Sequence, residues 1–534
     1  MTSAPFPGHK PVILVGSMVS VGLAGLAAAL AHPPWGMLIG LLGYGMLMRE
    51  LDRLGGPRRW PAALLLGWIS GMGYFVPSLL WLAHPFEVDR EAQGWMAPFA
   101  VILMSAILAT FWAVAAATYR FLARREPSRI LLFAASMIGL EWLRGHLFTG
   151  FPWDLVGESW RAGSWPSQAA AWVGAYGLGW LTLVVASAPF VVFEGRPGRR
   201  VASLGLAVLV GLYVVGWFRL AHAPAVTENG PLVRIVQANV KQESKYDARL
   251  FASIVSRYLE LSARPVQGAP GRRPDIIVWP EGAIPAAFED YLGEGSWTRD
   301  AISKVVSPGQ TLILGGYRYG ALVNGEPIAF NSLAAFTPVA GRLTLVGLYD
   351  KFRLVPFGEY MPFDSVATRW GVKQFVHVGD GFTPGPQPAP LTAPGLPTLQ
   401  PLICYESLFP GLTREGARHT GVRAAWIANI SNDAWFGANI GPRQHLNLAS
   451  YRAIEEGLPM VRATPTGISA MIDPYGRILP GARLSQGAYG VIDARLPAAL
   501  KPTVYNRWGD APLTAMLIVS LIGASAPARL RRGR

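Results

Sequence analysis

Residues 399–409 read Leu-Gln-Pro-Leu-Ile-Cys-Tyr-Glu-Ser-Leu-Phe and contain the only cysteine of the 534-residue chain. The chain therefore forms no intramolecular disulfide. A short apolar run, Pro401 to Ile403, leads into Cys404, and Glu406 lies two residues beyond it. An apolar strand that ends at a reactive side chain can aim it into a pocket, although a lone cysteine is also commonly an inert core residue. The stretch predicts a strand followed by a candidate nucleophile.

The composition is that of a membrane protein. Hydrophobic residues make up 51% of the chain and charged residues only 15%, with a mean hydropathy of +0.29. Soluble domains average about a quarter charged residues. The net charge of +14 raises the question of nucleic-acid binding, but the placement of the arginines described below indicates topology, so we expect no nucleic-acid partner. The length leaves room for a membrane bundle and a further domain.

Eight apolar stretches approach the length that crosses a bilayer. They lie at 11–31, 34–48, 60–83, 95–118, 130–147, 168–193, 202–218 and 511–527, of which the second and fifth are weak. The first resembles a signal peptide at Ala29-Leu-Ala31, but its apolar region is longer than a signal core. The sequence therefore predicts a polytopic α-helical bundle of about eight spans. Seven lie in residues 1–220, and residues 510–534 form a C-terminal span with a basic tail.

Arginines collect in alternate loops between these stretches. They are Arg49, Arg53, Arg58 and Arg59 after the second span, Arg120, Arg124, Arg125 and Arg129 after the fourth, and Arg196, Arg199 and Arg200 after the sixth. Arginine-rich loops face the cytoplasm. An odd number of preceding spans then places residues 221–509 on the extracytoplasmic side.

One charged pair lies inside the fifth predicted span. Glu141 and Arg144 are one helical turn apart. They form either a self-paired couple or a polar site facing the bundle interior, because charges within membrane segments are often functional. The self-paired couple is slightly favoured.

Residues 221–509 change character and predict a layered α/β or α+β domain. Short β-like runs occur at 232–238, 275–280, 311–316, 343–349, 424–430 and 488–493, with helical spacing at 247–263 and 443–457. The proline- and glycine-rich segment 382–397 predicts an exposed loop.

Three polar residues follow three of the predicted strands. Glu281 follows 275–280, Lys351 follows 343–349, and Cys404 ends the run described first. A carboxylate can take the proton of a thiol, and a lysine cation lowers a thiol pKa and faces a developing oxyanion. Each residue alone is weak evidence, since an isolated Glu or Lys is normally a solvated surface group. Together they predict a site for nucleophilic catalysis.

Four motifs carry a resemblance to a known family. They are Trp-Pro-Glu-Gly at 279–282, the segment 350–360 (DKFRLVPFGEY), Ile-Cys-Tyr-Glu at 403–406, and 431–437 (SNDAWFG). In this order they resemble the Glu-Lys-Cys signatures of the nitrilase (carbon-nitrogen hydrolase) superfamily. With seven spans before and one after, the whole chain resembles its membrane-embedded branch, the apolipoprotein N-acyltransferase family. The resemblance implies a nitrilase-like αββα sandwich.

The resemblance also implies roles for individual residues. Glu281 would be the general base, Lys351 the oxyanion stabiliser and Cys404 the nucleophile. Glu359 and Glu406 would be supporting carboxylates that order this triad.

Three aromatic residues complete the implied site. Tyr405 would supply a backbone N–H beside the nucleophile, and Tyr246 and Trp435 would contact substrate. Tyr246 stands where the family commonly has a tryptophan, so its role is less defined.

The implied reaction is a two-step acyl transfer in the bacterial inner membrane, with the catalytic domain on the periplasmic side. Cys404 would take an acyl chain from a membrane phospholipid as a thioester and pass it to the free amine of a diacylglyceryl-cysteine apolipoprotein. No cofactor or metal is expected, because His146, His377 and His445 lack a ligand-like grouping. His445 is a less favoured alternative partner for Cys404.

Two other functions stay open at this stage. A membrane-anchored amidase or ester hydrolase would use the same triad and pass the acyl group to water. A transporter or scaffold with a vestigial domain would be expected to have lost at least one triad residue, and all three are present.

Overall fold

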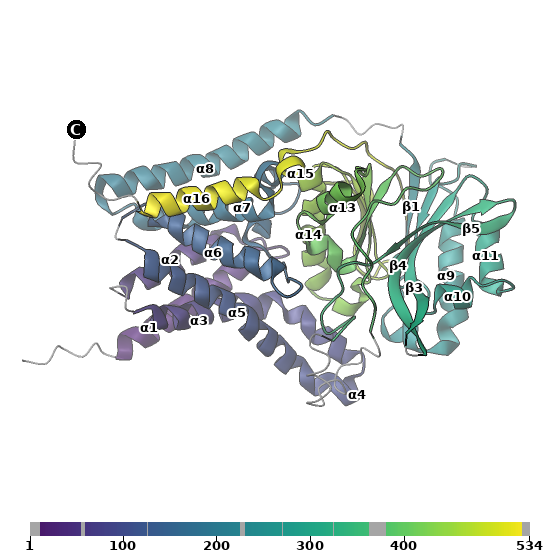
Figure 1. Ribbon diagram of the computed structural model, residues 1–534, viewed down its shortest axis with the longest axis horizontal. Helices are drawn as coiled ribbons and strands as arrows, with labels where there is room; N and C mark the ends of the chain where they lie inside the picture. The colour runs from purple at the N-terminus through teal and green to yellow at the C-terminus, as the bar shows by residue number, and fades with distance from the viewer. Residues whose placement is uncertain are drawn as a thin grey trace, which may run out of the picture.

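The computed structural model describes residues 11–54, 59–124, 126–224, 230–269, 271–323, 325–361 and 381–525. A helical bundle lies beside a domain that contains two β-sheets, and the last long helix returns to the bundle (Figure 1). Arg58, Arg125, His377 and the predicted basic tail lie outside the described residues.

Every predicted apolar stretch contains a helix. The bundle helices are α1 Pro11–Leu30, α2 Leu42–Arg53, α3 Trp60–Ser78, α5 Ala97–Leu122, α6 Arg129–His146, α7 Ala170–Ser187, α8 Gly195–Ala221 and α16 Ala511–Ser525. Short helices and 3-10 turns connect them, among them η3 Leu80–Glu87, α4 Arg90–Gln93, η5 Val156–Ser159 and η6 Pro166–Ala169.

Fewer of these helices are suited to cross a membrane than the eight expected. Among the described residues, three helical segments are long and apolar enough, namely Arg90–Leu122, Pro166–Val191 and Gly195–Ala221. Trp60–Ser78 and Leu80–Glu87 add a fourth if this pair, bent by 50°, is one broken span. The count of about eight is therefore not confirmed. One reason is that the 12-residue α2 is only about 18 Å long, well short of the bilayer core.

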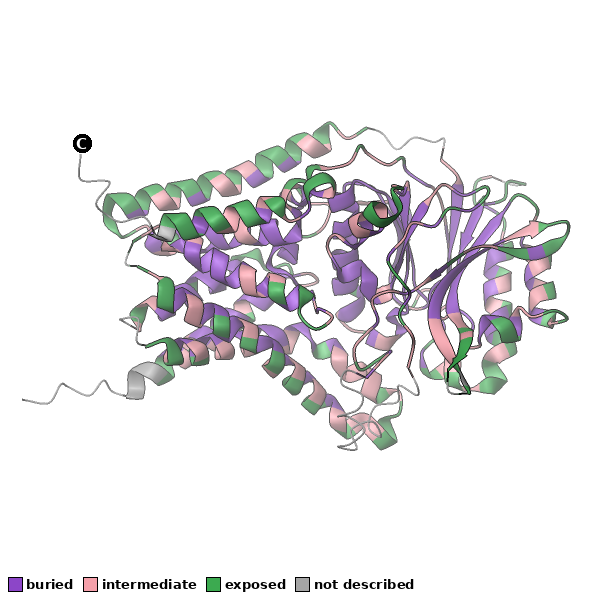
Figure 2. Ribbon diagram, viewed as in Figure 1, coloured by how far each residue is buried: buried purple, intermediate pink, exposed green. Residues whose placement is uncertain are grey.

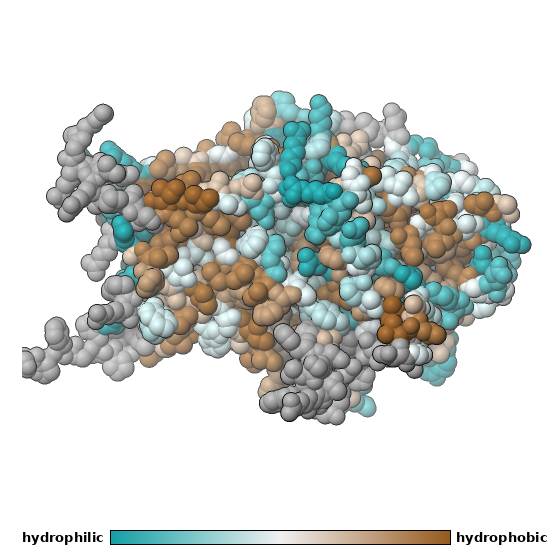
Figure 3. Space-filling view, in the orientation of Figure 1, coloured by the Kyte–Doolittle hydropathy of each residue, from teal (hydrophilic) through white to brown (hydrophobic). Residues whose placement is uncertain are grey.

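Small residues let the bundle helices approach closely. A Cβ at Gly71 would lie 2.8 Å from the Cα of Ala109, so α3 and α5 touch backbone to backbone there. This is the packing that glycine permits between helices in lipid. Apolar side chains cover much of the outer surface of the bundle (Figure 3), and α8 exposes many of them (Figure 2).

Glu141 and Arg144 form the predicted self-paired couple, and both also face the interior. Their side chains are 3.5 Å apart and buried. Arg144 donates to the carbonyl oxygens of Phe151 at 2.8 Å and Trp153 at 2.9 Å, and Glu141 accepts from the backbone of Val156 at 3.0 Å. The couple therefore fixes the irregular segment that follows α6.

The second domain contains a six-stranded and a five-stranded sheet. The first has the order β11-β1-β2-β3-β4-β5, with β1 Leu232–Gln237, β2 Ile276–Val278, β3 Thr311–Val323, β4 Glu326–Val339, β5 Arg342–Asp350 and β11 Gly490–Arg495. The second has the order β10-β9-β8-β7-β6, with β6 Leu399–Ile403, β7 Trp426–Ile430, β8 Met460–Ala463, β9 Ser469–Ile472 and β10 Ile478–Leu484. Each sheet is built around three neighbouring parallel strands, β1-β2-β3 and β6-β7-β8.

The two sheets pack face to face between helices. Ile235 and Ile313 of the first sheet share one core with Ile403 and Trp426 of the second. The helices α9 Phe251–Ala263, α10 Phe288–Tyr291 and α11 Trp297–Val305 lie outside the first sheet, and α13 Leu412–Thr420 and α14 Gly441–Glu456 lie outside the second (Figure 1). The layers therefore follow the αββα order.

The segment 382–397 has no helix or extended strand, but it is not wholly exposed as predicted. Leu391, Ala393 and Leu396 are buried in the core between the sheets. The apolar residues among its prolines cover the end of that core, which explains the difference.

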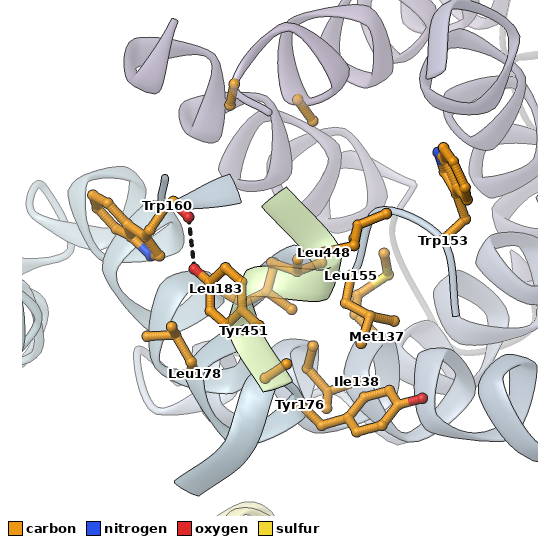
Figure 4. Packing of buried hydrophobic residues seen from close by; sticks show 14 of the residues in the cluster. Met137, Ile138, Trp153, Leu155, Trp160, Tyr176, Leu178, Leu183, Leu448 and Tyr451 are labelled. Carbon is orange, nitrogen blue, oxygen red and sulfur yellow. Dashed lines mark hydrogen bonds between the residues drawn. The ribbon is translucent and has the colours of Figure 1, made fainter. Parts of the chain in front are cut away.

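Helix α14 joins the two-sheet domain to the bundle. Leu448 and Tyr451 pack in one hydrophobic cluster with Leu155 and Tyr176 of the bundle side (Figure 4). The hydroxyl of Tyr451 donates to the carbonyl oxygen of Trp160 at 2.6 Å.

Further polar contacts lie on the same face of α14, because residues three and four apart share a helix face. Gln444 donates to Asp154 at 2.9 Å, and Glu455 accepts from the backbone of Ala175 at 2.8 Å. Since α14 also covers the sheet that contains β6, it fixes the strand end at Cys404 relative to the bundle.

Candidate active site

The ends of β2, β5 and β6 bring the three predicted residues together. Glu281 lies three residues beyond β2, while Lys351 and Cys404 directly follow β5 and β6. The ammonium nitrogen of Lys351 is 3.5 Å from Glu281 Oε1 and 2.9 Å from the Glu359 carboxylate. Glu281 and Lys351 both act electrostatically on the Cys404 thiol. The predicted supporting carboxylate Glu359 therefore belongs to the same cluster.

Asn331 on β4 aligns the two carboxylates. Its side-chain amide donates to Glu281 Oε1 at 2.7 Å and to Glu359 Oε1 at 2.6 Å, and its backbone carbonyl oxygen accepts from the backbone N–H of Lys351 at 2.8 Å. The sequence prediction missed Asn331 because it missed β4. The β4–β5 hairpin turns at Ala340 and Gly341, both with positive φ, and alanine is not a residue that usually indicates such a turn.

The second oxygen of Glu281 has its own donor. The backbone N–H of Asn432, which follows β7, donates to Glu281 Oε2 at 2.7 Å. Asn432 belongs to the quoted motif 431–437, so the sequence contained the signal, but no role was predicted for it. With both oxygens held, the carboxylate of Glu281 has a defined orientation.

Lys351 is a buried cation whose charge is stabilised locally. Burial alone would lower its pKa, but the carboxylates of Glu359 and Glu281 outweigh that effect and raise the pKa well above its ordinary value. An ammonium group has three N–H donors, and these two carboxylates occupy two of them. Among the residues that the structure describes, nothing accepts from the third N–H, so a substrate oxygen can do so.

Cys404 has a strained backbone and a thiol whose pKa is raised. Its φ of 48° is in the left-handed region, where residues other than glycine are uncommon and often functional. Burial raises the pKa of the thiol, Glu281 raises it further, and Lys351 only partly opposes them. Lys351 does lower the thiol pKa, as expected, but burial and Glu281 outweigh its effect. The thiol needs a base to act as a nucleophile.

Glu406 joins the loop of Lys351 to the turn of Cys404. Its Oε1 accepts from the Tyr349 hydroxyl at 2.7 Å and from the backbone of Phe352 at 2.8 Å and Arg353 at 3.2 Å. Its Oε2 accepts from the backbone of Ile403 at 2.8 Å. The side chain is fully buried, and the contacts fit the supporting role predicted for it.

Comparison with known proteins agrees with this geometry. Residues 24–188 match the family model of the apolipoprotein N-acyltransferase N-terminal domain, and residues 232–503 match that of carbon-nitrogen hydrolases. A Caulobacter vibrioides apolipoprotein N-acyltransferase is 50% identical over 513 residues, which cover 96% of this chain and 94% of the relative. The chain belongs to the apolipoprotein N-acyltransferase family.

Two less similar relatives also match over nearly the whole chain. Apolipoprotein N-acyltransferases of Bradyrhizobium diazoefficiens and Rhodopseudomonas palustris are each 36% identical to this chain. The aligned regions cover 93% of this chain and 93% of the first relative, and 94% of this chain and 92% of the second. The similarity therefore includes both the bundle and the two-sheet domain.

The three aromatic residues expected at the site differ in how far they are exposed and in what they contact. The hydroxyl of Tyr405 donates to the carbonyl oxygen of Gly150 at 2.6 Å, so its side chain is directed at the bundle. Tyr246, 67% exposed, lies on the 3-10 turn Glu243–Tyr246. Trp435 is half-buried on the turn Asp433–Phe436.

His445 contacts the backbone of the nucleophile. Its Nε2 is 3.3 Å from the Cys404 carbonyl oxygen and 3.0 Å from the Ser407 hydroxyl, while its Nδ1 is 3.0 Å from Asp433. Burial and the nearby Arg462 lower the pKa of His445, which favours the neutral ring. This arrangement supports the turn at Cys404 and does not make His445 the partner of the thiol.

Proposed function

We propose that this protein transfers an acyl chain from a membrane phospholipid to the free N-terminal amine of diacylglyceryl-cysteine apolipoproteins. The acyl chain would travel on Cys404 as a thioester. The observation that carries the proposal is the ion-paired cluster of Lys351, Glu281 and Glu359 at the strand ends that also present Cys404, in a domain packed on an apolar bundle. The relatives are named apolipoprotein N-acyltransferases, which supports an apolipoprotein as the acceptor.

In the first step Glu281 takes the proton of the Cys404 thiol while the sulfur attacks the acyl ester of the phospholipid. The carbonyl oxygen becomes an oxyanion, and the free N–H of Lys351 stabilises it. Collapse of this intermediate breaks the C–O bond. The proton on Glu281 passes to the leaving oxygen, which gives a lysophospholipid and an acyl thioester.

In the second step the acceptor amine attacks the thioester carbonyl. Glu281 accepts a proton from the amine nitrogen, and Lys351 again stabilises the oxyanion. Collapse breaks the C–S bond, and the thiolate recovers the proton. The product is an N-acylated lipoprotein, and the enzyme returns to its starting state. This two-step exchange is ping-pong catalysis.

The bundle supports a lipid substrate and a location in the bacterial inner membrane. Residues 1–220 would form the membrane domain and residues 510–534 the last membrane segment. The arginine-rich loops support a cytoplasmic face, so the catalytic domain, residues 221–509, would lie on the periplasmic side. Contacts from α14 and Tyr405 hold the site against the bundle, where acyl chains can reach it from the bilayer.

The main rival is a hydrolase that passes the acyl group to water. Purified protein in micelles is supplied with phospholipid carrying a labelled acyl chain and with a diacylglyceryl-cysteine peptide. We expect labelled peptide amide, and little free fatty acid when the peptide is left out. The control is the same peptide with an acetylated N-terminus, which has no amine to acylate. Release of fatty acid without peptide, at the rate of turnover with it, would establish the hydrolase instead.

A further inference from the structure

A second lysine lies beside the general base and has no role in the steps above. Lys245 is on the turn Glu243–Tyr246, and its ammonium donates to the Asn432 side-chain oxygen at 3.3 Å. The backbone of Asn432 donates to Glu281, and its amide donates to Gln242 at 3.0 Å. Lys245 is thus held next to the residue that positions the base.

The backbone around Glu281 leaves space for this ammonium group. Gly282, with a φ of 57°, directly follows the base, and a Cβ there would lie 3.4 Å from Lys245 Nζ. The side chain is half-buried. The ammonium therefore lies over Gly282, at the rim of the catalytic cluster.

Among the described residues, Lys245 has no carboxylate partner, although burial disfavours an unpaired cation. Within the described ranges, no carboxylate lies within ion-pair distance of it, whereas Lys241 on the same loop is 4.0 Å from Glu243. Burial lowers the pKa of Lys245 to about 8, and Glu281 only partly opposes this. A desolvated cation without a partner is unfavourable unless a ligand supplies the opposite charge.

We infer that Lys245 binds the phosphate group of the acyl-donor phospholipid. The inference rests on the proposed function, in which this phosphate is joined to the same glycerol as the ester that Cys404 attacks. The acceptor amine is itself basic, so a lysine cation would not attract it. A compact ammonium is well suited to phosphate as a point charge.

The test compares two acyl donors that carry the same acyl chain. One is a phospholipid, and the other is the p-nitrophenyl ester, which has no phosphate. The rate of acyl-enzyme formation is measured with each donor for wild type, Lys245→Met and Lys245→Arg. The ratio of the phospholipid rate to the p-nitrophenyl ester rate then isolates recognition of the phosphate, because the neutral ester reports whether the site is folded and reactive.

We expect this ratio to fall about tenfold or more in Lys245→Met, as for loss of a charged hydrogen bond. Lys245→Arg should restore most of it. The matched control is Lys241→Met, on the same loop but exposed and paired with Glu243, and it should leave the ratio unchanged.

The pH dependence adds a readout that a structural role would not produce. In wild type the KM for phospholipid should rise as pH increases through about 8, the pKa of Lys245, because the cation is lost. Lys245→Arg should remove this rise, since arginine keeps its charge. The other ionisable groups in or beside this cluster are Glu281, Lys351, Glu359, Asp433, Tyr246, the Cys404 thiol and the Lys241–Glu243 pair, and all of them are present in both proteins.

Several outcomes would overturn the inference. Equal loss with both donors would make Lys245 a structural residue, and no loss with either would remove it from donor binding. A defect confined to discharge of a preformed thioester by the peptide would place it in the amine step. If wild type forms no adduct from phospholipid, the proposed function fails before Lys245 is tested.

Discussion

Replacing Glu406 with glutamine tests whether the site is held together by one buried carboxylate. Glu406 accepts four hydrogen bonds, from Tyr349, Phe352, Arg353 and Ile403. These link the strand ends at Lys351 and Cys404. A glutamine of nearly the same size has only one acceptor oxygen, and its amide nitrogen is a donor.

The loss of folding free energy in Glu406→Gln can be estimated from these contacts. If the glutamine oxygen faces the three donors around Oε1, its NH₂ group faces the N–H of Ile403, and an unsatisfied buried donor costs about 1–3 kcal/mol. The three remaining bonds lose their charge assistance, about 1 kcal/mol each. The neutral side chain avoids part of the burial cost that raises the pKa of Glu406. The net destabilisation of Glu406→Gln is therefore about 2–4 kcal/mol.

The assay measures thermal unfolding in detergent and acyl transfer on the same preparation. We expect a lower unfolding midpoint and a kcat reduced by about tenfold or more, because small displacements of catalytic groups are costly. Glu260→Gln is the control, since Glu260 is an exposed partner of Arg264, and it should change neither quantity. A Glu406→Gln protein with wild-type midpoint and kcat would refute the positioning role.

Three further predictions concern the cation, the thiol and the topology. Lys351→Arg should lower kcat about a hundredfold or more, because a planar fork replaces a compact ammonium at the oxyanion, and a loss under about threefold would leave it only a salt-bridge partner. Since the pKa of the Cys404 thiol is raised, its alkylation by iodoacetamide should keep accelerating with pH beyond about 8.5, the ordinary thiol value; a plateau at lower pH would indicate a preformed thiolate. A periplasmic reporter fused after residue 225 should be active, and one fused after Arg125 silent, whereas the reverse pattern would contradict the proposed orientation.

The sequence predicted the residues that the structure brings together at the strand ends, but not all of the contacts that hold them. Glu281, Lys351 and Cys404 were found because each follows an apolar run, and such runs become parallel or edge strands whose ends meet. Asn331 and Lys245 were missed because each reaches the site through a tertiary contact with no local signal. The raised pKa of Cys404 was missed for the same reason, since burial is a property of the fold.

For the membrane part, the sequence predicted where the helices are but not how they cross the bilayer. Apolar composition correctly located the helices but not how many are suited to cross a bilayer, because hydropathy does not distinguish a full span from a short or bent helix. The contact between α14 and the bundle was also not predictable. Gln444, Tyr451 and Glu455 are polar residues in a helical pattern, which alone indicates a solvated face. Here their partners are Asp154, Trp160 and Ala175 of the bundle side.

The central claim is that Cys404 carries the acyl chain, and mass spectrometry of the protein tests it most directly. After incubation with phospholipid and no acceptor, we expect one acyl chain on the peptide that contains Cys404, labile to neutral hydroxylamine as a thioester is. Adding a diacylglyceryl-cysteine peptide should remove it and yield the N-acylated product. Cys404→Ala should form no adduct and transfer nothing. Acyl transfer by the Cys404→Ala protein would contradict the mechanism.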